Sequence, residues 1–211
     1  MSPVGVFGGT FDPIHYGHLR SAYELLQDLR LAEVRFVPSA APPHRGGTFA
    51  PAELRYRMVE VAVADQDGFA VDDREFHREG PSYTVDTLMA IREERRDASI
   101  CLILGMDAYL GLTTWHRWDE ILGLAHIIVA HRPGWQLPET GALGDLLAKH
   151  GTENVDDLHR QPCGHIYHHA VTQLEIASTE IRELVAAGKD PRFLMPDGVR
   201  DIIVESGCYT N

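Results

Sequence analysis

PVGVFGGTFDPIHYGH, residues 3–18, is the stretch that indicates the fold. Its first five residues form a short apolar run typical of a buried strand, and the glycines and proline that follow are typical of a turn. From Leu19 to Leu29 apolar side chains recur at helical spacing, and EVRFVP at 33–38 is a second short apolar run. This order predicts a β-α-β unit, whose crossover should be right-handed.

The rest of the chain continues the alternation of strands and helices. Further strands are expected at 100–105, 125–134 and 166–171. The first of them, ICLILG, is apolar without alternation, as expected where helices cover both faces of a parallel sheet. We therefore predict a doubly wound α/β fold with a mostly parallel sheet, in a single domain over residues 1–211.

Helices and loops are expected between these strands. The predicted helices follow Pro51 and cover 82–96, 141–151, 178–188 and 196–207, and the predicted loops are 39–50 and 152–164. On the helix after Pro51, the apolar face should carry Leu54, Met58 and Val61.

Composition narrows the classes of function. The 211 residues include 31 acidic and 19 basic side chains, a net charge of −12. So negative a net charge disfavours non-specific binding to nucleic acid or to an anionic membrane. A phosphate-bearing ligand must therefore be held by local donors. The three cysteines form no CxxC pair, no apolar stretch reaches the roughly 20 residues of a membrane span, and the N-terminus lacks a signal-peptide pattern. We expect a soluble, cytoplasmic protein.

Polar and glycine-rich motifs follow the predicted strands. These motifs are GGTFDP at 8–13, SAAPPHR at 39–45, GMD at 105–107 and HRPG at 131–134. Open α/β sheets bind ligands along the carboxyl ends of their strands, near the point where strand order reverses. Loops are generally polar, but that does not explain why these loops carry histidine and arginine. We therefore predict a ligand site at this edge.

The glycine turn after the first strand is suited to a phosphate. Gly8 and Gly9 let the backbone approach a ligand closely and expose N–H groups, those of Thr10 and Phe11 among them. The turn has no GK[ST] sequence and does not match GxGxxG, so it is neither a Walker A loop nor a dinucleotide fingerprint.

Two histidines stand at the start of the next helix. His15 and His18 are one turn apart and therefore lie on the same side. Both imidazoles can donate to phosphate oxygens at a helix N-terminus, where the dipole favours an anion. Histidines at this spacing can also ligate zinc, although no third ligand is evident nearby, or can simply be solvated at the helix end. We favour the phosphate interpretation.

A second group of donors lies near the C-terminus. Ser178 and Thr179 begin a predicted helix, and Arg182 follows one turn later on the same side. Taken alone, Ser178 is a good N-cap and Arg182 an ordinary surface charge. Two helix N-termini facing one cleft suit a ligand with several phosphates, so we predict a second anion site here.

These motifs together resemble the GxFDPxHxGH and STxIR signatures of the HxGH nucleotidyltransferases, which transfer a nucleotidyl group from a nucleoside triphosphate. The resemblance extends over nearly the whole chain to the bacterial nicotinate-nucleotide adenylyltransferase family. It is carried by GGTFDPIHYGHL, FVPSAAPPHR, PSYTVDTL, LILGMDAYLGLTTWHRW, AHIIVAHRPG and IASTEIR. The sequence departs from the family at Ala177, where serine is usual, and at Arg45, where lysine is frequent.

The resemblance implies a Rossmann-like nucleotidyltransferase fold and a step of NAD biosynthesis. The substrates would be ATP and nicotinate mononucleotide, and the products nicotinate adenine dinucleotide and pyrophosphate. Mg²⁺ would be carried with ATP, without a firm protein ligand. The attacking phosphate monoester is largely ionised at pH 7, since its second pKa is about 6, so no general base or covalent enzyme intermediate is needed.

The resemblance also implies roles for individual residues. His15, His18 and Arg182 would be catalytic. ATP and its phosphates would contact Gly8, Gly9, Thr10, Phe11, His18, His44, Arg45, Gly105, Asp107, Ser178, Thr179 and Arg182. The mononucleotide would contact Ser82, Tyr83, Thr84, Trp115 and His116. Asp107 would bind the adenosine ribose, and Trp115 would stack on the pyridine ring.

Alternatives stay open at this level. Asp107 could be a helix N-cap, and Trp115 could belong to the core, to which we assign Trp118. A sister nucleotidyltransferase with another acceptor would keep the phosphate motifs, but the SYT and TTW segments argue against it. A non-catalytic nucleotide sensor would share the fold, but the intact phosphate-binding residues argue against it. The oligomeric state is left open.

Overall fold

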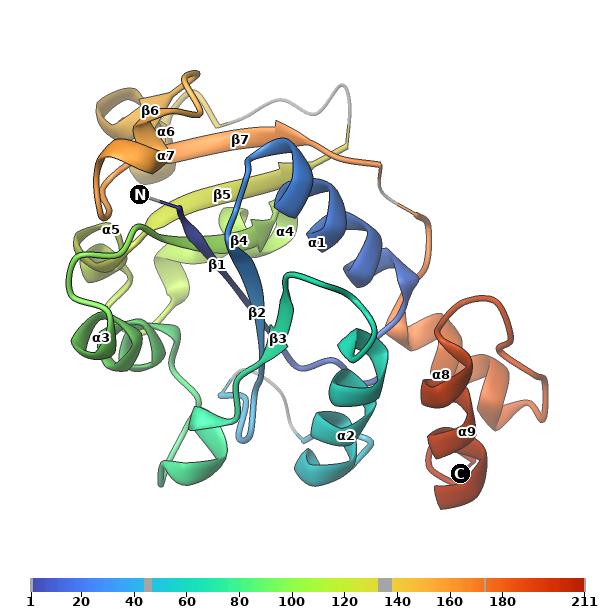
Figure 1. The fold of residues 1–211 in the computed structure, drawn as a ribbon. Helices are drawn as coiled ribbons and strands as arrows, with labels where there is room; N and C mark the ends of the chain where they lie inside the picture. Colours follow the sequence, from blue (N-terminus) through green and yellow to red (C-terminus); the bar gives the residue numbers. More distant parts are fainter. Residues whose placement is uncertain (1, 44–46, 133–137, 173, 211) are drawn as a thin grey trace.

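The computed structural model describes residues 2–43, 47–132, 138–172 and 174–210. Within them, seven strands form one sheet in the order β3-β2-β1-β4-β5-β7-β6. The strands are β1 (Val4–Gly9), β2 (Glu33–Pro38), β3 (Phe69–Val71), β4 (Ile100–Gly105), β5 (His126–His131), β6 (Gly151–Thr152) and β7 (Ile166–Ala170). All paired strands are parallel, and the chain reverses its direction across the sheet between β1 and β4. The predicted doubly wound fold is confirmed (Figure 1).

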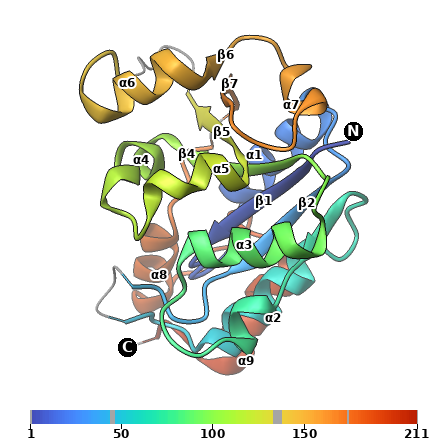
Figure 2. The ribbon, with the colours of Figure 1, turned by 90° about the vertical axis from the view of Figure 1, so that its left-hand side faces the viewer.

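Helices cover both faces of the sheet. They are α1 (Tyr16–Asp28), α2 (Ala52–Val63), α3 (Thr84–Glu94), α4 (Met106–Leu110), α5 (Ile121–Leu124), α6 (Gly141–His150), α7 (Asp157–Arg160), α8 (Ser178–Ala186) and α9 (Asp197–Ser206). In Figure 2, α3, α4 and α5 lie on the near side of the sheet, with α1 and α8 on the far side. Each layer has its own hydrophobic cluster, with Leu25 and Ile181 in one and Leu88 and Ile121 in the other.

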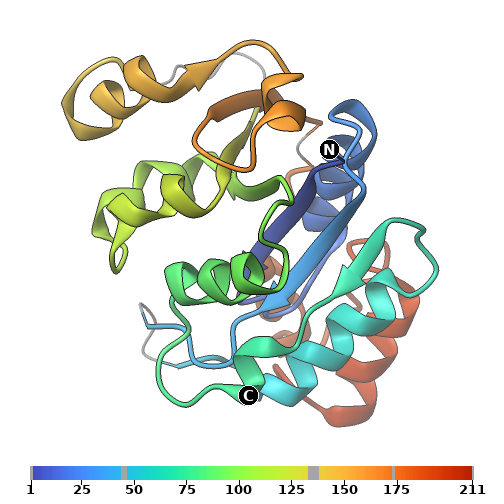
Figure 3. The ribbon, with the colours of Figure 1, turned by 60° about the vertical axis from the view of Figure 1, so that its left-hand side comes forward.

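The C-terminal helices α8 and α9 belong to the layer whose hydrophobic cluster contains Leu25 and Ile181. α9 packs against α2, and the two lie side by side in Figures 2 and 3. The contact is close, because a Cβ added at Gly198 of α9 would lie 2.4 Å from a methyl group of Val61. Across the described part of the chain, each helix is too short or too polar to reach through a bilayer.

The structure corrects the sequence prediction in three places. Strands β3 and β6 were not predicted, because runs of three and two residues at a sheet edge carry almost no periodic signal. The predicted loop 152–164 contains the single-turn helix α7. On α2, the buried face includes Arg55 and Met58, while Val61 is 43% exposed beside α9, so the predicted face was rotated from the true one.

Candidate active site

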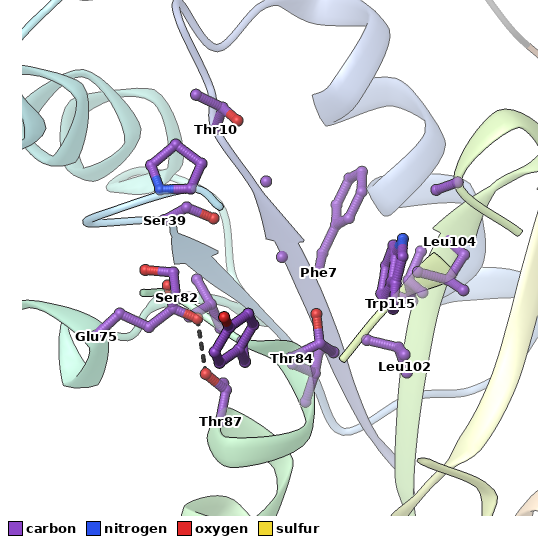
Figure 4. A pocket seen from close by; sticks show the side chains of 18 of the residues that line it. Phe7, Thr10, Ser39, Glu75, Ser82, Thr84, Thr87, Leu102, Leu104 and Trp115 are labelled. Carbon is purple, nitrogen blue, oxygen red and sulfur yellow. Dashed lines mark hydrogen bonds between the residues drawn. The ribbon is translucent and has the colours of Figure 1, made fainter. Parts of the chain in front are cut away.

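The carboxyl ends of β1, β2 and β4 surround a pocket of about 290 Å³, close to the lower end of the range for small-molecule sites. The predicted site residues that line it are Gly8, Gly9, Thr10, Ser82, Tyr83, Thr84, Gly105, Trp115 and His116. Figure 4 shows Trp115 beside Leu102 and Leu104, with Ser39 and Ser82 on the opposite side. Segments far apart in the sequence therefore meet in one cavity.

The two glycines of the first turn have different roles. A Cβ at Gly8 would meet nothing within 4 Å, so this backbone is open to the pocket that it lines. A Cβ at Gly9 would lie 2.9 Å from the ring of Phe11, which is buried beneath it. Gly9 is therefore required by the packing of Phe11 as well as by any ligand.

His15 and His18 are adjacent, as predicted. His15 is the N-cap of α1, and its Nδ1 accepts a hydrogen bond from the N–H of Gly17 at 3.1 Å. The neutral ring therefore carries its proton on Nε2, and this nitrogen has no hydrogen bond to another described residue. The two imidazoles are stacked with centroids 3.8 Å apart. Nδ1 of His18 is buried without a hydrogen-bond partner among the described residues.

The environment of these rings keeps them uncharged. Burial lowers the pKa of His15 to about 4. Burial and then the neighbouring His15 hold the pKa of His18 well below its ordinary value. Both rings are thus neutral donors at pH 7, and a bound polyphosphate would favour their protonated forms.

The N-terminus of α8 meets this first turn. The hydroxyl of Ser178 donates to the carbonyl of Pro13 at 2.9 Å, and Arg182 donates to the carbonyl of Asp12 at 2.7 Å. Arg182 also donates to the hydroxyl of Thr179 at 3.0 Å. The N-cap of α8 is Ala177 rather than Ser178. The two predicted anion-binding helix ends are therefore together, and the Ser178 hydroxyl proton links them.

The predicted acceptor segment forms the other side of the pocket. Tyr83 is the N-cap of α3 and makes no side-chain capping bond, and its ring stacks on His116 with centroids 4.3 Å apart. Ser82 accepts the N–H of Ala41, which links this segment to the loop after β2. Trp115 is partly buried against the core and faces the pocket, and Trp118 is likewise only partly buried. Trp118 packs against the hydrophobic cluster around Leu88 and Ile121, in agreement with its assignment to the core.

Of the remaining predicted residues, Asp107 lies beside the pocket-lining Gly105, and two others are not among the described residues. Asp107 is exposed in the first turn of α4, whose N-cap is Gly105, so Asp107 is not the N-cap. Its carboxylate is thus available to a ligand. His44 and Arg45 lie outside the described residues.

Two buried charged residues of the site were missed from the sequence. Glu75, 6% exposed on the pocket wall, accepts the Thr87 hydroxyl at 2.7 Å, and its second oxygen has no partner in the described chain (Figure 4). Arg55 lies beneath the first turn and donates to the carbonyl of Thr10 at 2.6 Å. A lone arginine within the apolar stripe of a helix was a usable signal for Arg55, whereas nothing in the sequence marks Glu75.

Comparison with known proteins agrees with this geometry. The profile of the cytidylyltransferase-like family matches residues 6–184. A protein of Aeromonas salmonicida (strain A449) named "Probable nicotinate-nucleotide adenylyltransferase" is 47% identical over 208 residues, covering 99% of this chain and 97% of its own. One with the same name from Acidithiobacillus ferrooxidans is 48% identical over 207 residues, covering 97% and 94%.

The fold is also found among solved structures. Plasmodium falciparum nicotinic acid mononucleotide adenylyltransferase complexed with NaAD superposes with a TM-score of 0.73 at 16% identity, covering 99% of this chain and 98% of that one. At this identity the similarity shows the shared fold. The family profile and the relatives of nearly equal length identify the chain as a member of the cytidylyltransferase-like family and, within it, of the nicotinate-nucleotide adenylyltransferases.

Proposed function

We propose that this protein transfers the adenylyl group of ATP to nicotinate mononucleotide, giving nicotinate adenine dinucleotide and pyrophosphate for NAD biosynthesis. The observation that carries the proposal is that Gly8–Thr10, Ser82–Thr84 and Trp115 line one pocket. The phosphate turn and the acceptor segment thus face the same space, as a transfer between two nucleotides requires. We further propose that residues 1–211 act as one catalytic domain in the cytoplasm, where ATP is available and cysteines stay reduced.

The chemistry needs positioning and charge neutralisation. An oxygen of the mononucleotide phosphate attacks the α-phosphorus of ATP and forms a P–O bond. The bond from that phosphorus to the α,β-bridging oxygen breaks, and pyrophosphate leaves with the electron pair. The attacking group is already ionised at pH 7, since its second pKa is about 6, so no side chain has to remove a proton. Catalysis then depends on in-line alignment and on donors aimed at the developing charge.

The residues of the first turn and of α8 are suited to these tasks. His15 offers its Nε2–H, and His18 lies stacked beside it, so we assign both to the α- and β-phosphates. We assign Arg182 and Thr179 to the β- and γ-phosphates and to the departing pyrophosphate. The Ser178 hydroxyl already donates to the carbonyl of Pro13 and thereby joins α8 to the first turn. We therefore assign the backbone N–H of Ser178, rather than its hydroxyl, to the phosphates.

The acceptor half of the pocket supports nicotinate mononucleotide over nicotinamide mononucleotide, which has a neutral carboxamide in place of the carboxylate. The first N–H groups of α3 have no side-chain cap at Tyr83 and lie beside the pocket. A helix N-terminus favours a carboxylate by about 0.3–1 kcal/mol at exposed positions. We propose that these N–H groups face the nicotinate carboxylate while Trp115 stacks on the ring, and that Asp107 accepts from the adenosine ribose.

Mg²⁺ fits this site as a companion of ATP. In the described part of the chain, no three His, Cys, Asp or Glu side chains gather as a metal cage. Both oxygens of Asp12, the carboxylate of the first turn, already accept hydrogen bonds. We therefore propose that the triphosphate itself carries the ion, whose chemistry is to neutralise charge on the phosphate oxygens.

Pyrophosphate release from Mg-ATP tests the proposal. The purified protein is assayed with nicotinate mononucleotide, nicotinamide mononucleotide and phosphopantetheine as acceptors, and the dinucleotide product is identified by mass. We expect the highest kcat/KM with nicotinate mononucleotide. A higher value with either other acceptor would contradict the assignment of the substrate. No release with any acceptor, despite ATP binding, would support a nucleotide sensor.

A further inference from the structure

Asp12 connects segments that are distant in the sequence. It lies in the loop after β1 and is 3% exposed. Its carboxylate accepts the N–H groups of Phe49 and Ala50 at 2.8 and 3.1 Å and the phenol of Tyr209 at 2.6 Å. One buried carboxylate therefore joins the loop after β1, the end of the loop after β2 and the C-terminus of the chain.

The backbone of the same loop is also held from outside. Its carbonyl oxygens accept hydrogen bonds from Arg55 at Thr10 (2.6 Å), from Arg182 at Asp12 (2.7 Å) and from Ser178 at Pro13 (2.9 Å). Within the loop, Phe11 has a φ of 47°, a conformation that is uncommon for a residue other than glycine. Because this conformation is locally disfavoured, contacts from other elements determine the shape of the loop.

Tyr209 is the member of this network that lies farthest from Asp12 in the sequence. It follows α9 and is 6% exposed, beyond the residues matched by the family profile. Burial, and then the neighbouring Asp12, raise the pKa of Tyr209, so the phenol keeps its proton over the physiological range. A phenylalanine would fill nearly the same volume. What the hydroxyl adds is the hydrogen bond to Asp12.

We propose that Tyr209 is a positioning residue for the phosphate site, acting through Asp12. Its hydroxyl orients the carboxylate that holds Phe49 and Ala50, and this keeps the loop carrying the Thr10 N–H in place against α8. The inference rests on the proposed function of that loop. A misplacement of about 1 Å in a reacting group costs on the order of 100-fold in rate, so a small shift of this loop should be measurable in kcat.

The test is Tyr209→Phe, with Asp12→Asn and the double variant. Tyr209→Phe should lower kcat by roughly 10- to 100-fold, by the same positioning argument, while the KM for nicotinate mononucleotide stays nearly unchanged. In the Asp12→Asn background, the same substitution should have little further effect, because the hydroxyl acts through the carboxylate. Amide exchange at Phe49 and Ala50 should be faster in Tyr209→Phe whether or not substrate is present.

Ser99→Ala is the matched control. Ser99 is fully buried, and its hydroxyl donates to the carbonyl of Leu158 at the opposite end of the sheet. This variant should lower Tm without changing kcat. If Tyr209→Phe behaves like this control, so that only Tm falls while kcat and the exchange at Phe49 and Ala50 stay normal, Tyr209 is merely structural and the inference is wrong.

Failure of the proposed function can be recognised separately. If the wild-type protein forms no dinucleotide from ATP and nicotinate mononucleotide, the assigned reaction is wrong. The exchange measurement still tests the structural connection from Tyr209 through Asp12 to Phe49 and Ala50 in that case, because it does not depend on the reaction. Unchanged exchange in Tyr209→Phe would overturn the inference.

Discussion

The two ends of the sheet both bury histidines, yet the histidines differ in what their nitrogens contact. At the carboxyl end, His15 is 5% exposed, and at the amino end His126 is 0% exposed as the first residue of β5. Burial lowers the pKa of each to about 4. Nε2 of His126 donates to the carbonyl of Gln161 at 2.9 Å, and its Nδ1 accepts the N–H of His165 at 3.0 Å. Both nitrogens of His126 are therefore used within the fold.

The carboxyl end keeps donors available. Nδ1 of His15 is used as a cap, which leaves Nε2–H, and Nδ1 of His18 has no partner in the described chain. Burial and a lowered pKa are thus common to both ends and do not distinguish a site from a core. The distinguishing feature is donor capacity that the fold itself leaves unused, close in the chain to the turn Gly8–Thr10 that lines the pocket.

Two arginines show the same contrast. Arg92, near the amino end, donates to the carbonyls of Leu124, Arg95, Arg96, Ala98 and Pro162. Arg182, at the carboxyl end, donates to Asp12 and Thr179, and its guanidinium lies 4.2 Å from the ring centroid of Phe49. Arg92 fastens backbone segments together, whereas Arg182 has donor capacity left for phosphate.

The largest effect is expected for the histidines, whose replacement should lower kcat at the carboxyl end of the sheet and stability at the amino end. His18→Ala should lower kcat by about 100- to 1,000-fold, the cost of losing one donor to developing charge, while Tm changes little. His126→Ala should leave kcat unchanged at low temperature but destabilise the fold by about 1–3 kcal/mol, because Gln161 and His165 lose their partner. Steady-state kinetics and thermal melting of both variants test this. Near-normal turnover in His18→Ala would remove it from the catalytic residues.

A smaller effect is expected at the tryptophans of the acceptor side. Trp115→Ala should raise the KM for nicotinate mononucleotide by roughly 5- to 150-fold, because aromatic stacking contributes about 1–3 kcal/mol, and should hardly change the KM for ATP. Trp118→Ala is the matched control, since Trp118 packs against the same core but does not line the pocket. It should lower Tm without a selective change in KM. If both variants lose stability alike and neither changes the mononucleotide KM, the acceptor site is misassigned.

The smallest expected effect concerns pH. Because the folded pKa of His15 and of His126 is about 4, against an ordinary value of 6.5, the unfolded chain binds more protons below pH 6.5. Stability is therefore full above pH 6.5 and falls as the pH approaches 4. Between pH 7.5 and 5.5 each histidine should cost about 1 kcal/mol of unfolding free energy, using 1.36 kcal/mol per pKa unit.

Denaturant unfolding of His15→Gln and His126→Gln checks this prediction. Each substitution should flatten the pH dependence by a similar amount, but His15→Gln alone should lower kcat. If the slope stays at the wild-type value in both variants, the acid sensitivity arises elsewhere. Equal kinetic losses in the two variants would instead remove the functional difference between the two ends of the sheet.

Much of the molecule was determined by local sequence. Apolar runs of about six residues marked β1, β2, β4 and β5, and glycine, proline and helical periodicity marked the long helices between them. The turn residues and histidines of 8–18 and the hydroxyls and arginine of 178–182 predicted an anion site, because their chemistry is carried by residues close together in the chain. The assignment of a nicotinate acceptor came from the family resemblance.

Only the tertiary structure decided how these pieces meet. Local patterns do not report side chains that are brought together by packing, so Glu75 and Tyr209 had no recognised role from the sequence. Arg55 stands out within the apolar stripe of its helix, but its partner, the carbonyl of Thr10, is known only from the structure. The same limitation applies to Ser178, whose hydroxyl looked like a cap and instead donates to Pro13 in another segment. Residue type and spacing specify what a group can donate or accept. Which donors remain unused depends on partners distant in the chain, which only the folded arrangement supplies.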